Sequence, residues 1–292
     1  MNFLSGFEHI VREHESLAAY TTLGIGGPAR YLIEPTSEAE FIAAVRACSG
    51  AGVPMRVIGG GSNILVREAG FEGAVFSLTS PAFTSMSADG DTVRCGCGAR
   101  LAHFISFCVG AKLRGLEHLV GIPGTVGGAL HGNAGTLNGD IGSLVIRARL
   151  LNSQGLVVEV DRNAMDFGTR RSSLDELAIL DATFKLRPDD AASLTKRMQT
   201  LWIVKRGSQP DQSTRTAPAF IDPDPGAASE LIIESSLAGY REGHVLISPA
   251  YPNYVVIDGP ATSDDVIRLL SAVGRRVEER TGVQLQLHPR IW

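Results

Sequence analysis

The sequence predicts an α+β fold divided into two domains. With 292 residues, 44% of them hydrophobic, the chain can bury more than one core. Short β-rich runs alternate with helical runs through the first half, and the sheet-like pattern ends near Pro188. We therefore expect a first domain over residues 1–190, with subdomains of about 1–80 and 81–190. A smaller α+β domain should follow over 191–292.

The elements of the first domain follow from local patterns. Ser37 and Glu40 have the spacing of a capping box, so a helix should begin there and continue to about residue 51. Apolar residues at helical spacing predict a second helix over 99–113. The runs rich in β-branched and apolar residues are expected to be strands: 29–33, 55–58, 92–97, 144–151, 157–160 and 182–186.

The second domain is predicted in the same way. Residues 209–226 are rich in Pro, Asp and Thr and predict a long loop. Thr262 should open an amphipathic helix, and the alternation of VQLQL over 283–287 is typical of a strand. The remaining expected elements are helices over 192–204 and 229–237 and strands over 244–248 and 254–257.

Charge and composition exclude several classes of function. The net charge is −4 with both signs well mixed, so a nucleic-acid partner is not expected. No stretch approaches the ~20 apolar residues that span a bilayer, and no signal peptide is visible, so we expect a soluble, cytoplasmic protein. Four cysteines are too few for a disulfide framework. Cys95 and Cys97 lie too close together for a usual zinc pair, so we expect small apolar side chains and no metal site.

The segment Gly121–Gly142 carries eight glycines in 22 positions and almost no charge. Such density predicts backbone in left-handed or tight turns, or backbone lying against a ligand. A flexible linker would be more polar, whereas apolar residues are interleaved here. The sequence favours a ligand-lining loop over a structural cluster of turns.

A second glycine run, Ile58-Gly-Gly-Gly-Ser-Asn-Ile64, follows a predicted strand directly. Successive backbone N–H groups without Cβ atoms can converge on an anion, and the side chains of Ser62 and Asn63 add polar groups. No Gly-Lys-Ser/Thr follows, which disfavours a nucleoside triphosphatase. The run predicts a cradle for a diphosphate.

Three motifs together resemble the UDP-N-acetylenolpyruvoylglucosamine reductases (MurB family): TTLGIGGPARYL at 21–32, VIGGGSNILV at 57–66 and GLEHLVGIPGTVGGALHGNAG at 115–135. The resemblance implies an FAD-binding fold of the vanillyl-alcohol-oxidase (PCMH) type, followed by a substrate domain. It also implies non-covalent FAD, with NADPH as reductant and a small-molecule substrate.

By this resemblance, FAD is held by the two glycine segments. The implied cofactor-binding residues are Gly59, Gly60, Gly61, Ser62, Asn63, Ile64, Gly121, Ile122, Pro123, Gly124, Thr125, Gly127, Gly128, Asn133, Ala134, Gly135, Ile141 and Gly142. Two interpretations of His131 stay open: it faces the flavin, or it satisfies backbone carbonyls.

The resemblance breaks at the proton-donor residues. In the family, hydride passes from NADPH through FAD to a vinyl carbon, and a serine protonates the resulting enol, with a glutamate and an arginine alongside. Here Pro218 stands at the serine position, and proline has no side-chain proton. Ile221 stands for a lysine and His288 for the glutamate, while Arg170 keeps the arginine position.

We predict that His288 and Arg170 are catalytic. Arg170, Arg206 and Asn253 are predicted to bind substrate. An imidazole ordinarily titrates at about 6.5 and can exchange a proton at neutral pH. The alternatives are that His288 makes an incidental hydrogen bond, that Arg170 is an ordinary surface arginine, and that Ser213 or Thr216 supplies the proton.

The two glycine segments thus match the family, whereas the residues at the proton-donor positions are replaced. This contrast predicts a diverged FAD-dependent oxidoreductase that acts on a different substrate in specialised biosynthesis, with a carrier protein or pathway partner. The first alternative is the family reaction, reduction of UDP-N-acetylglucosamine enolpyruvate in peptidoglycan synthesis. The second is a non-catalytic flavin-binding protein.

Overall fold

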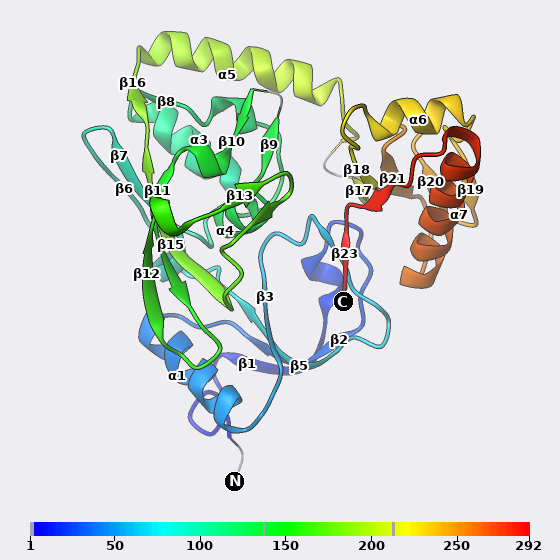
Figure 1. The fold of residues 1–292 in the computed structure, drawn as a ribbon. Helices are drawn as coiled ribbons and strands as arrows, with labels where there is room; N and C mark the ends of the chain where they lie inside the picture. The colour runs from blue at the N-terminus through cyan, green and yellow to red at the C-terminus, as the bar shows by residue number, and fades with distance from the viewer. Residues whose placement is uncertain (1–2, 137, 212–213) are drawn as a thin grey trace. The chain divides into compact units, whose positions relative to one another are not determined.

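The computed structural model describes residues 3–136, 138–211 and 214–292 (Figure 1). Ser213, the alternative proton donor, and Leu137, within the glycine segment, lie outside the described residues. The chain forms two compact units that interleave along the sequence. The first unit comprises Met1–Glu15, Ala29–Gly60 and Glu72–Lys205, and the second comprises Ser16–Pro28, Gly61–Phe71 and Arg206–Trp292. The domain boundary at residue 190 stays a prediction.

A four-stranded sheet lies mainly in the first unit. Its order is β1 (Val11–Ser16), β2 (Pro28–Ile33), β5 (Phe71–Ser77) and β3 (Met55–Ile58), with β3 parallel to β5. Helix α1 (Glu38–Gly50) packs beside it through a fully buried Phe41 that contacts the rings of Phe76 and Phe83. Ser37 caps α1 as predicted, accepting the N–H of Glu40 at 3.2 Å.

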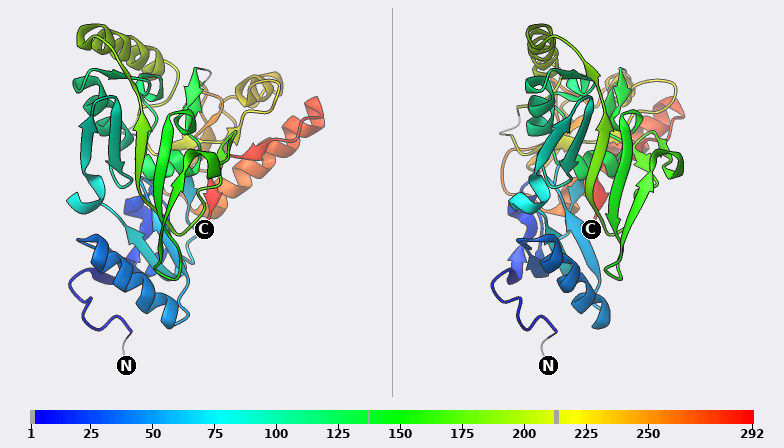
Figure 2. Two further views of the ribbon diagram at one scale, coloured as in Figure 1. Left: turned by 60° about the vertical axis from the view of Figure 1, so that its left-hand side comes forward. Right: turned by 90° about the vertical axis from the view of Figure 1, so that its left-hand side faces the viewer.

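A five-stranded antiparallel sheet lies in the first unit (Figure 2). Its order is β12 (Val157–Asp161), β11 (Val145–Leu151), β15 (Ala178–Lys185), β7 (Thr92–Gly96) and β6 (Met86–Asp89). Helix α4 (Val126–His131) contacts β7 and β15, and α3 (Leu101–Gly110) packs on α4. Cys95 and Cys97 are buried free thiols in this core, which confirms their prediction as small apolar side chains.

Short elements connect these layers, and the sequence predicted none of them. They are α2 (Pro81–Thr84), β8 (Leu113–Arg114), the 3-10 helix η2 (Glu117–Leu119), the hairpin β9 (Gly135–Thr136) and β10 (Gly139–Asp140), η3 (Ile141–Ser143), η4 (Arg162–Ala164), the hairpin β13 (Phe167–Gly168) and β14 (Arg171–Ser172), and β16 (Arg187–Pro188). The predicted helix over 99–113 is shorter than expected, because β8 pairs with β16 where the helix was to continue.

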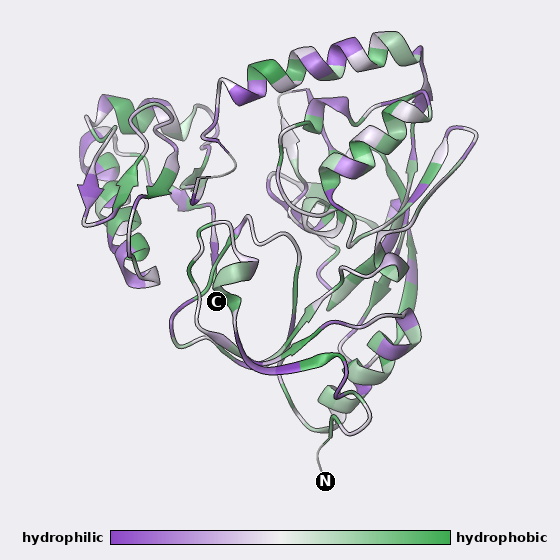
Figure 3. Ribbon diagram, turned by 180° about the vertical axis from the view of Figure 1, so that it is seen from behind, coloured by the Kyte–Doolittle hydropathy of each residue, from purple (hydrophilic) through white to green (hydrophobic). Residues whose placement is uncertain are grey.

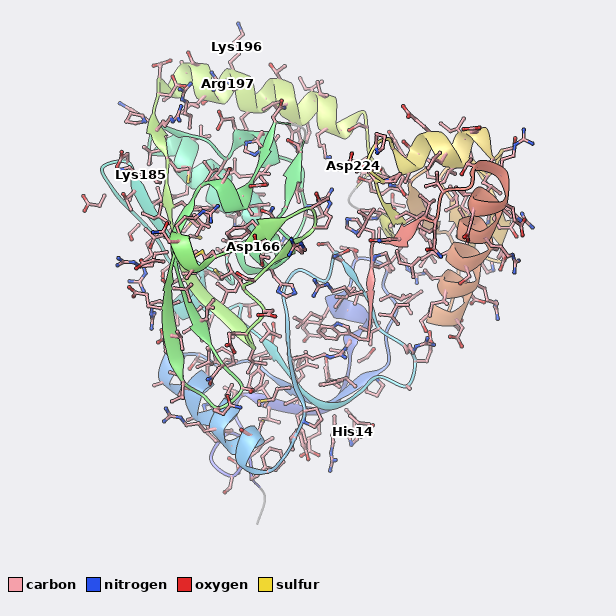
Figure 4. The ribbon with its side chains drawn as sticks, viewed as in Figure 1. His14, Asp166, Lys185, Lys196, Arg197 and Asp224 are labelled. Atoms are coloured by element: carbon pink, nitrogen blue, oxygen red, sulfur yellow. The ribbon has the colours of Figure 1, made fainter. Side chains whose placement is uncertain are left out.

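Helix α5 (Ala191–Arg206) is exposed along most of its length, with Leu194 its buried side chain. Figure 3 shows hydrophilic and hydrophobic residues alternating along it. Arg197, labelled in Figure 4, donates to the buried carboxylate of Glu117 at 2.9 Å. This ion pair attaches α5 to η2, directly before the glycine segment.

The second unit is an antiparallel sheet covered by two helices. The sheet order is β17 (Thr216–Pro218), β21 (Tyr254–Ile257), β20 (Val245–Ile247) and β19 (Arg241–Glu242); the helices are α6 (Ala228–Glu234) and α7 (Ser263–Thr281). Thr262 and Asp265 form a full capping box at α7. The predicted strand over 283–287 is wrong over most of its length, because its partner β18 (Phe220–Ile221) has two residues and pairs only with β22 (Gln286–Leu287).

The final short strand of the chain, β23 (Arg290–Ile291), pairs in parallel with β4 (Ile64–Leu65). Across the described residues, every helix is too short or too polar to span a bilayer. Within the same residues, no three His, Cys, Asp or Glu side chains gather as ligands for a metal ion.

Candidate functional site

The two glycine segments meet in the first unit. A Cβ on Gly60 would lie 2.6 Å from Cα of Gly124, and a Cβ on Gly59 would lie 2.6 Å from Oγ1 of Thr125. Gly124 also has a φ of +108°, which L side chains rarely adopt. Because real Cβ atoms do not approach backbone atoms this closely, glycine is required at residue 60, whereas a Cβ at residue 59 would displace the Thr125 hydroxyl. The structure therefore brings the two predicted cofactor segments side by side.

The first turns of the glycine segment are tied to the five-stranded sheet. Thr125 caps α4 by accepting the N–H of Gly128 at 3.3 Å. The N–H of Gly127 donates to the carbonyl of Cys97 at 2.8 Å, where β7 has just ended. These bonds hold residues 125–128 in one conformation, which agrees with a built loop and not with a linker.

The second half of the segment folds back on itself as the β9–β10 hairpin. The N–H of Ile141 donates to the carbonyl of Ala134 at 2.9 Å, which brings the two ends of the hairpin together. Nδ1 of His131 lies 3.1 Å from the carbonyl oxygen of Leu174. Of the two interpretations left open for His131, the structure supports the one in which it satisfies a backbone carbonyl.

Gly61, which begins a segment of the second unit, has a φ of +62°. A Cβ there would lie 1.8 Å from the carbonyl oxygen of Tyr20, and the Gly61 carbonyl accepts the N–H of Thr22 at 3.1 Å. Oδ1 of Asn63 is buried and has no hydrogen-bond partner among the described residues. A buried polar atom without a protein partner fits a polar ligand such as the FAD diphosphate, and the neighbouring glycines leave no room for a Cβ.

His288 lies between two parts of the second unit. Its backbone N–H donates to the carbonyl of Ala219 at 3.0 Å, next to Pro218. Two residues later, the N–H of Arg290 donates to the carbonyl of Asn63 at 2.9 Å. The segment that carries His288 therefore connects the loop of the replaced proton donor to the anion cradle. The catalytic role of His288 stays a prediction.

Asn253 uses its side chain to hold the same loop. Its Oδ1 accepts the N–H of Phe220 at 3.0 Å, and its Nδ2 donates to the carbonyl of Phe220 at 2.9 Å. The hydroxyl of Thr216, the alternative proton donor, donates to the carbonyl of Val255 at 2.6 Å. The hydroxyl of Thr216 is thus engaged within the sheet, and a substrate contact by Asn253 stays a prediction.

Arg170 lies in the turn of the β13–β14 hairpin of the first unit, with a φ of +58°. A non-glycine residue in this region is strained, and such strain concentrates at functional sites. Arg170 is exposed, and no carboxylate of the described residues pairs with it. The neighbouring Arg171 instead pairs with Asp166, labelled in Figure 4, at 3.2 Å.

Lys205, near the end of α5, lies within electrostatic range of Arg170. Burial lowers the pKa of Lys205, and the positive charge of Arg170 lowers it further. Two neighbouring cations favour an anionic ligand, because it relieves their repulsion. Arg206 is the last residue of α5, and its predicted contact with substrate stays a prediction.

Sequence reasoning missed how the β13–β14 hairpin is attached to the glycine segment. The hydroxyl of Ser172 donates to the carbonyl of His131 at 3.0 Å. A Cβ on Gly142 would lie 2.4 Å from the ring of Phe167, so the ring rests on the Gly142 backbone. No local pattern predicts these contacts, because each joins residues that lie far apart in sequence.

Two family models match the chain. One is described as an FAD binding domain and covers residues 29–161. The other is described as the C-terminal domain of UDP-N-acetylenolpyruvoylglucosamine reductase and covers residues 209–292. The first match agrees with the predicted FAD-binding fold and includes both glycine segments.

Whole-chain relatives carry a consistent name. A UDP-N-acetylenolpyruvoylglucosamine reductase of Rhodopirellula baltica is 42% identical over 284 residues, which is 97% of this chain and 93% of the relative. One of Methylorubrum extorquens is 34% identical, covering 94% of this chain and 88% of the relative. The crystal structure of the Thermus caldophilus reductase (MurB) superposes with a TM-score of 0.83 at 31% identity, covering 97% and 99% of the two chains.

Proposed function

The chain belongs to the UDP-N-acetylenolpyruvoylglucosamine reductase (MurB) family, and on this basis we propose that it reduces the enolpyruvyl group of that nucleotide sugar. It is an FAD-dependent oxidoreductase. The observation that carries the proposal is the 42% identity to a reductase over 97% of the chain, which spans both units.

The predicted divergence to another substrate is wrong. Relatives that match this chain over nearly its full length bear the name of the reductase itself. That prediction gave too much weight to Pro218, Ile221 and His288, which are three positions in a chain otherwise similar throughout. The expected carrier protein likewise has no support in these names.

FAD, when bound, supplies hydride transfer from NADPH to the vinyl carbon of the substrate. The chain provides the cradle for its diphosphate at residues 59–63 and a wall at residues 121–142. The close contacts of Gly59 and Gly60 with Thr125 and Gly124 support this assignment, since they bring the two predicted cofactor segments together.

Arg170 is the proposed ligand of the substrate carboxylate. Its guanidinium offers a planar fork for two parallel hydrogen bonds, and no carboxylate of the described residues occupies that fork. Lys205 adds a second positive charge nearby. Arg206 and Asn253 complete the proposed substrate-binding set, with Asn253 acting through the loop at Phe220 that it holds.

His288 is the proposed donor of the proton that completes the reduction. Proline at residue 218 leaves that position without a side-chain proton, and the His288 backbone N–H donates to the carbonyl of the adjacent Ala219. An imidazolium can release a proton near neutral pH and take it back from solvent. Ser172 and His131 support the site indirectly, since their hydrogen bond attaches the hairpin of Arg170.

Turnover of the purified holoenzyme tests the proposal. With UDP-N-acetylglucosamine enolpyruvate present, NADPH should be consumed in equal amounts with the formation of a product two hydrogens heavier, detected by mass spectrometry. Omitting the nucleotide gives the background rate. A protein that binds FAD and NADPH but yields no such product at any pH from 5 to 9 would contradict the proposal and favour a non-catalytic flavin-binding role.

A further inference from the structure

The side chain of Asn133 makes three hydrogen bonds inside the first unit. It is 5% exposed and follows α4 with a φ of +43°. Its Oδ1 accepts the N–H of Gly142 at 3.1 Å, and its Nδ2 donates to Oδ2 of Asp140 at 3.1 Å and to the carbonyl of Gly168 at 3.0 Å. The partners fix the orientation of the amide, because a backbone N–H can only donate and a carbonyl can only accept.

These partners belong to two different parts of the site. Gly142 and Asp140 lie in the wall formed by the glycine segment, whereas Gly168 lies in the β13–β14 hairpin, next to the turn that carries Arg170. The hairpin strands have two residues each, and a hairpin of that size is not stable alone. Its position therefore depends on the bonds that attach it to the wall.

We infer that Asn133 is a positioning residue, which fixes the hairpin of Arg170 against the cofactor wall so that the guanidinium meets the substrate carboxylate at a defined place. The inference rests on the proposed function for the identity of that carboxylate. The three internal bonds use both N–H donors of the amide and one acceptor site of Oδ1, while the cofactor contact predicted for Asn133 from the sequence stays a prediction.

Asn133→Asp is the substitution that isolates this role. Aspartate has nearly the same shape and also tolerates a positive φ, so the backbone can stay in place. The substitution replaces the donor by a carboxylate oxygen that faces both the Gly168 carbonyl and the Asp140 carboxylate. Repulsion between the two carboxylates raises the pKa of the pair, and a shared proton restores a donor at low pH.

Limited proteolysis with trypsin at pH 8 measures how firmly the β13–β14 hairpin is held, and it needs no substrate. Trypsin cleaves after arginine, and the exposed turn offers Arg170 and Arg171. We expect cleavage at this turn to be roughly 10-fold faster in Asn133→Asp than in the wild type, because local opening becomes easier. Asn138→Asp, which adds the same charge to the exposed part of the β9–β10 hairpin, should be cleaved at the wild-type rate.

Calorimetric titration with the enolpyruvyl nucleotide, without NADPH, measures the substrate affinity to which Arg170 is proposed to contribute. At pH 8 the Kd of Asn133→Asp should be roughly 10-fold above that of the wild type, and at pH 6 it should return toward the wild-type value. In an Arg170→Ala background, Asn133→Asp should add no further loss of affinity, since the effect passes through Arg170. FAD affinity should change less than twofold.

The outcomes separate this inference from the proposed function. Equal cleavage rates in Asn133→Asp and the wild type would overturn it, as would faster cleavage with an unchanged Kd for the nucleotide. A wild type that does not bind the nucleotide would remove the proposed function, while the cleavage rates would still decide whether Asn133 holds the hairpin. If Asn133→Asp does not fold, Asn133→Gly takes its place, since it keeps the positive φ and removes the three side-chain bonds.

Discussion

Arg170 should lower the stability of the protein while it serves substrate binding. Its φ of +58° places an L-residue in the left-handed region. Arg170→Gly and Arg170→Ala both remove the guanidinium, but only glycine adopts this backbone conformation without a Cβ clash. Comparing the two variants therefore separates the backbone strain from the loss of the side chain.

The expected difference follows from two opposing terms. Relief of the left-handed conformation favours the glycine variant by roughly 1–2 kcal/mol. Alanine restricts the unfolded chain more than glycine does, which favours the alanine variant by about 0.4–1 kcal/mol. The glycine variant should thus be more stable by about 0.5–1 kcal/mol, or about 1–3 °C in Tm for a chain of this size.

Both variants should lose substrate affinity alike. Losing the hydrogen bonds of a charged group costs about 1.5–3 kcal/mol, which is a roughly 10- to 150-fold fall in kcat/KM. Arg171→Ala is the matched control: it breaks an exposed ion pair with Asp166, and such pairs contribute about 0–1 kcal/mol. Arg171→Ala should leave kcat/KM unchanged.

Urea unfolding of the three variants, with the Tm of each measured in parallel, provides the stability comparison. Equal midpoints for Arg170→Gly and Arg170→Ala would refute the reasoning, because they would show that residue 170 carries no backbone strain in solution. Unchanged kcat/KM in both variants would instead remove Arg170 from the substrate site.

Three further predictions concern other parts of the site. Gly60→Ala should abolish FAD uptake, because its Cβ would lie 2.6 Å from Cα of Gly124. The control Gly50→Ala, whose Cβ would meet open space, should leave FAD uptake unchanged. Flavin absorbance after gel filtration measures the uptake of both variants. His288→Gln should keep FAD but lose roughly 10²–10⁴ in turnover, because glutamine cannot serve as the acid; turnover at the wild-type rate in the variant would exclude His288 as the donor. Lys205→Met should be more stable than the wild type at neutral pH, because the pKa of Lys205 is lowered in the folded state. Between this lowered pKa and the ordinary lysine pKa, the unfolded state binds more protons than the folded state. The stability of the wild type should therefore rise with pH through this window. Urea midpoints that rise equally with pH in the wild type and Lys205→Met would contradict this assignment.

Local patterns predicted the elements whose cause is local. Ser37 and Thr262 cap their helices as expected, because a capping bond joins residues three apart. Strand β5 was not predicted, since its buried residues run continuously and show no alternation. The alternation of residues 283–287 was misleading, because a strand extends only as far as its partner, and β18 has two residues.

In the site as well, features with a local cause were predicted and features with a long-range cause were not. The glycine segments were recognisable because the absence of side chains is itself visible in the sequence, and the structure gives steric reasons for Gly60 and Gly61. The role of Asn133 could not be recognised, because its partner Gly168 lies 35 residues away in a hairpin that was not predicted. The proximity of Lys205 to Arg170 is equally a product of tertiary structure.

The interleaved second unit constrains the order in which the protein can be made. Strand β4 pairs with β23, and Leu23 and Leu65 pack in the same core as α7. The ribosome adds residue 65 about 225 residues before it adds residue 290, which is an interval of roughly 10–45 s at typical elongation rates. During synthesis the early segments of this unit therefore emerge with exposed apolar side chains and an unpaired strand edge. Nascent chains should need protection over this interval, and a fragment comprising residues 206–292 alone should lack part of its own core.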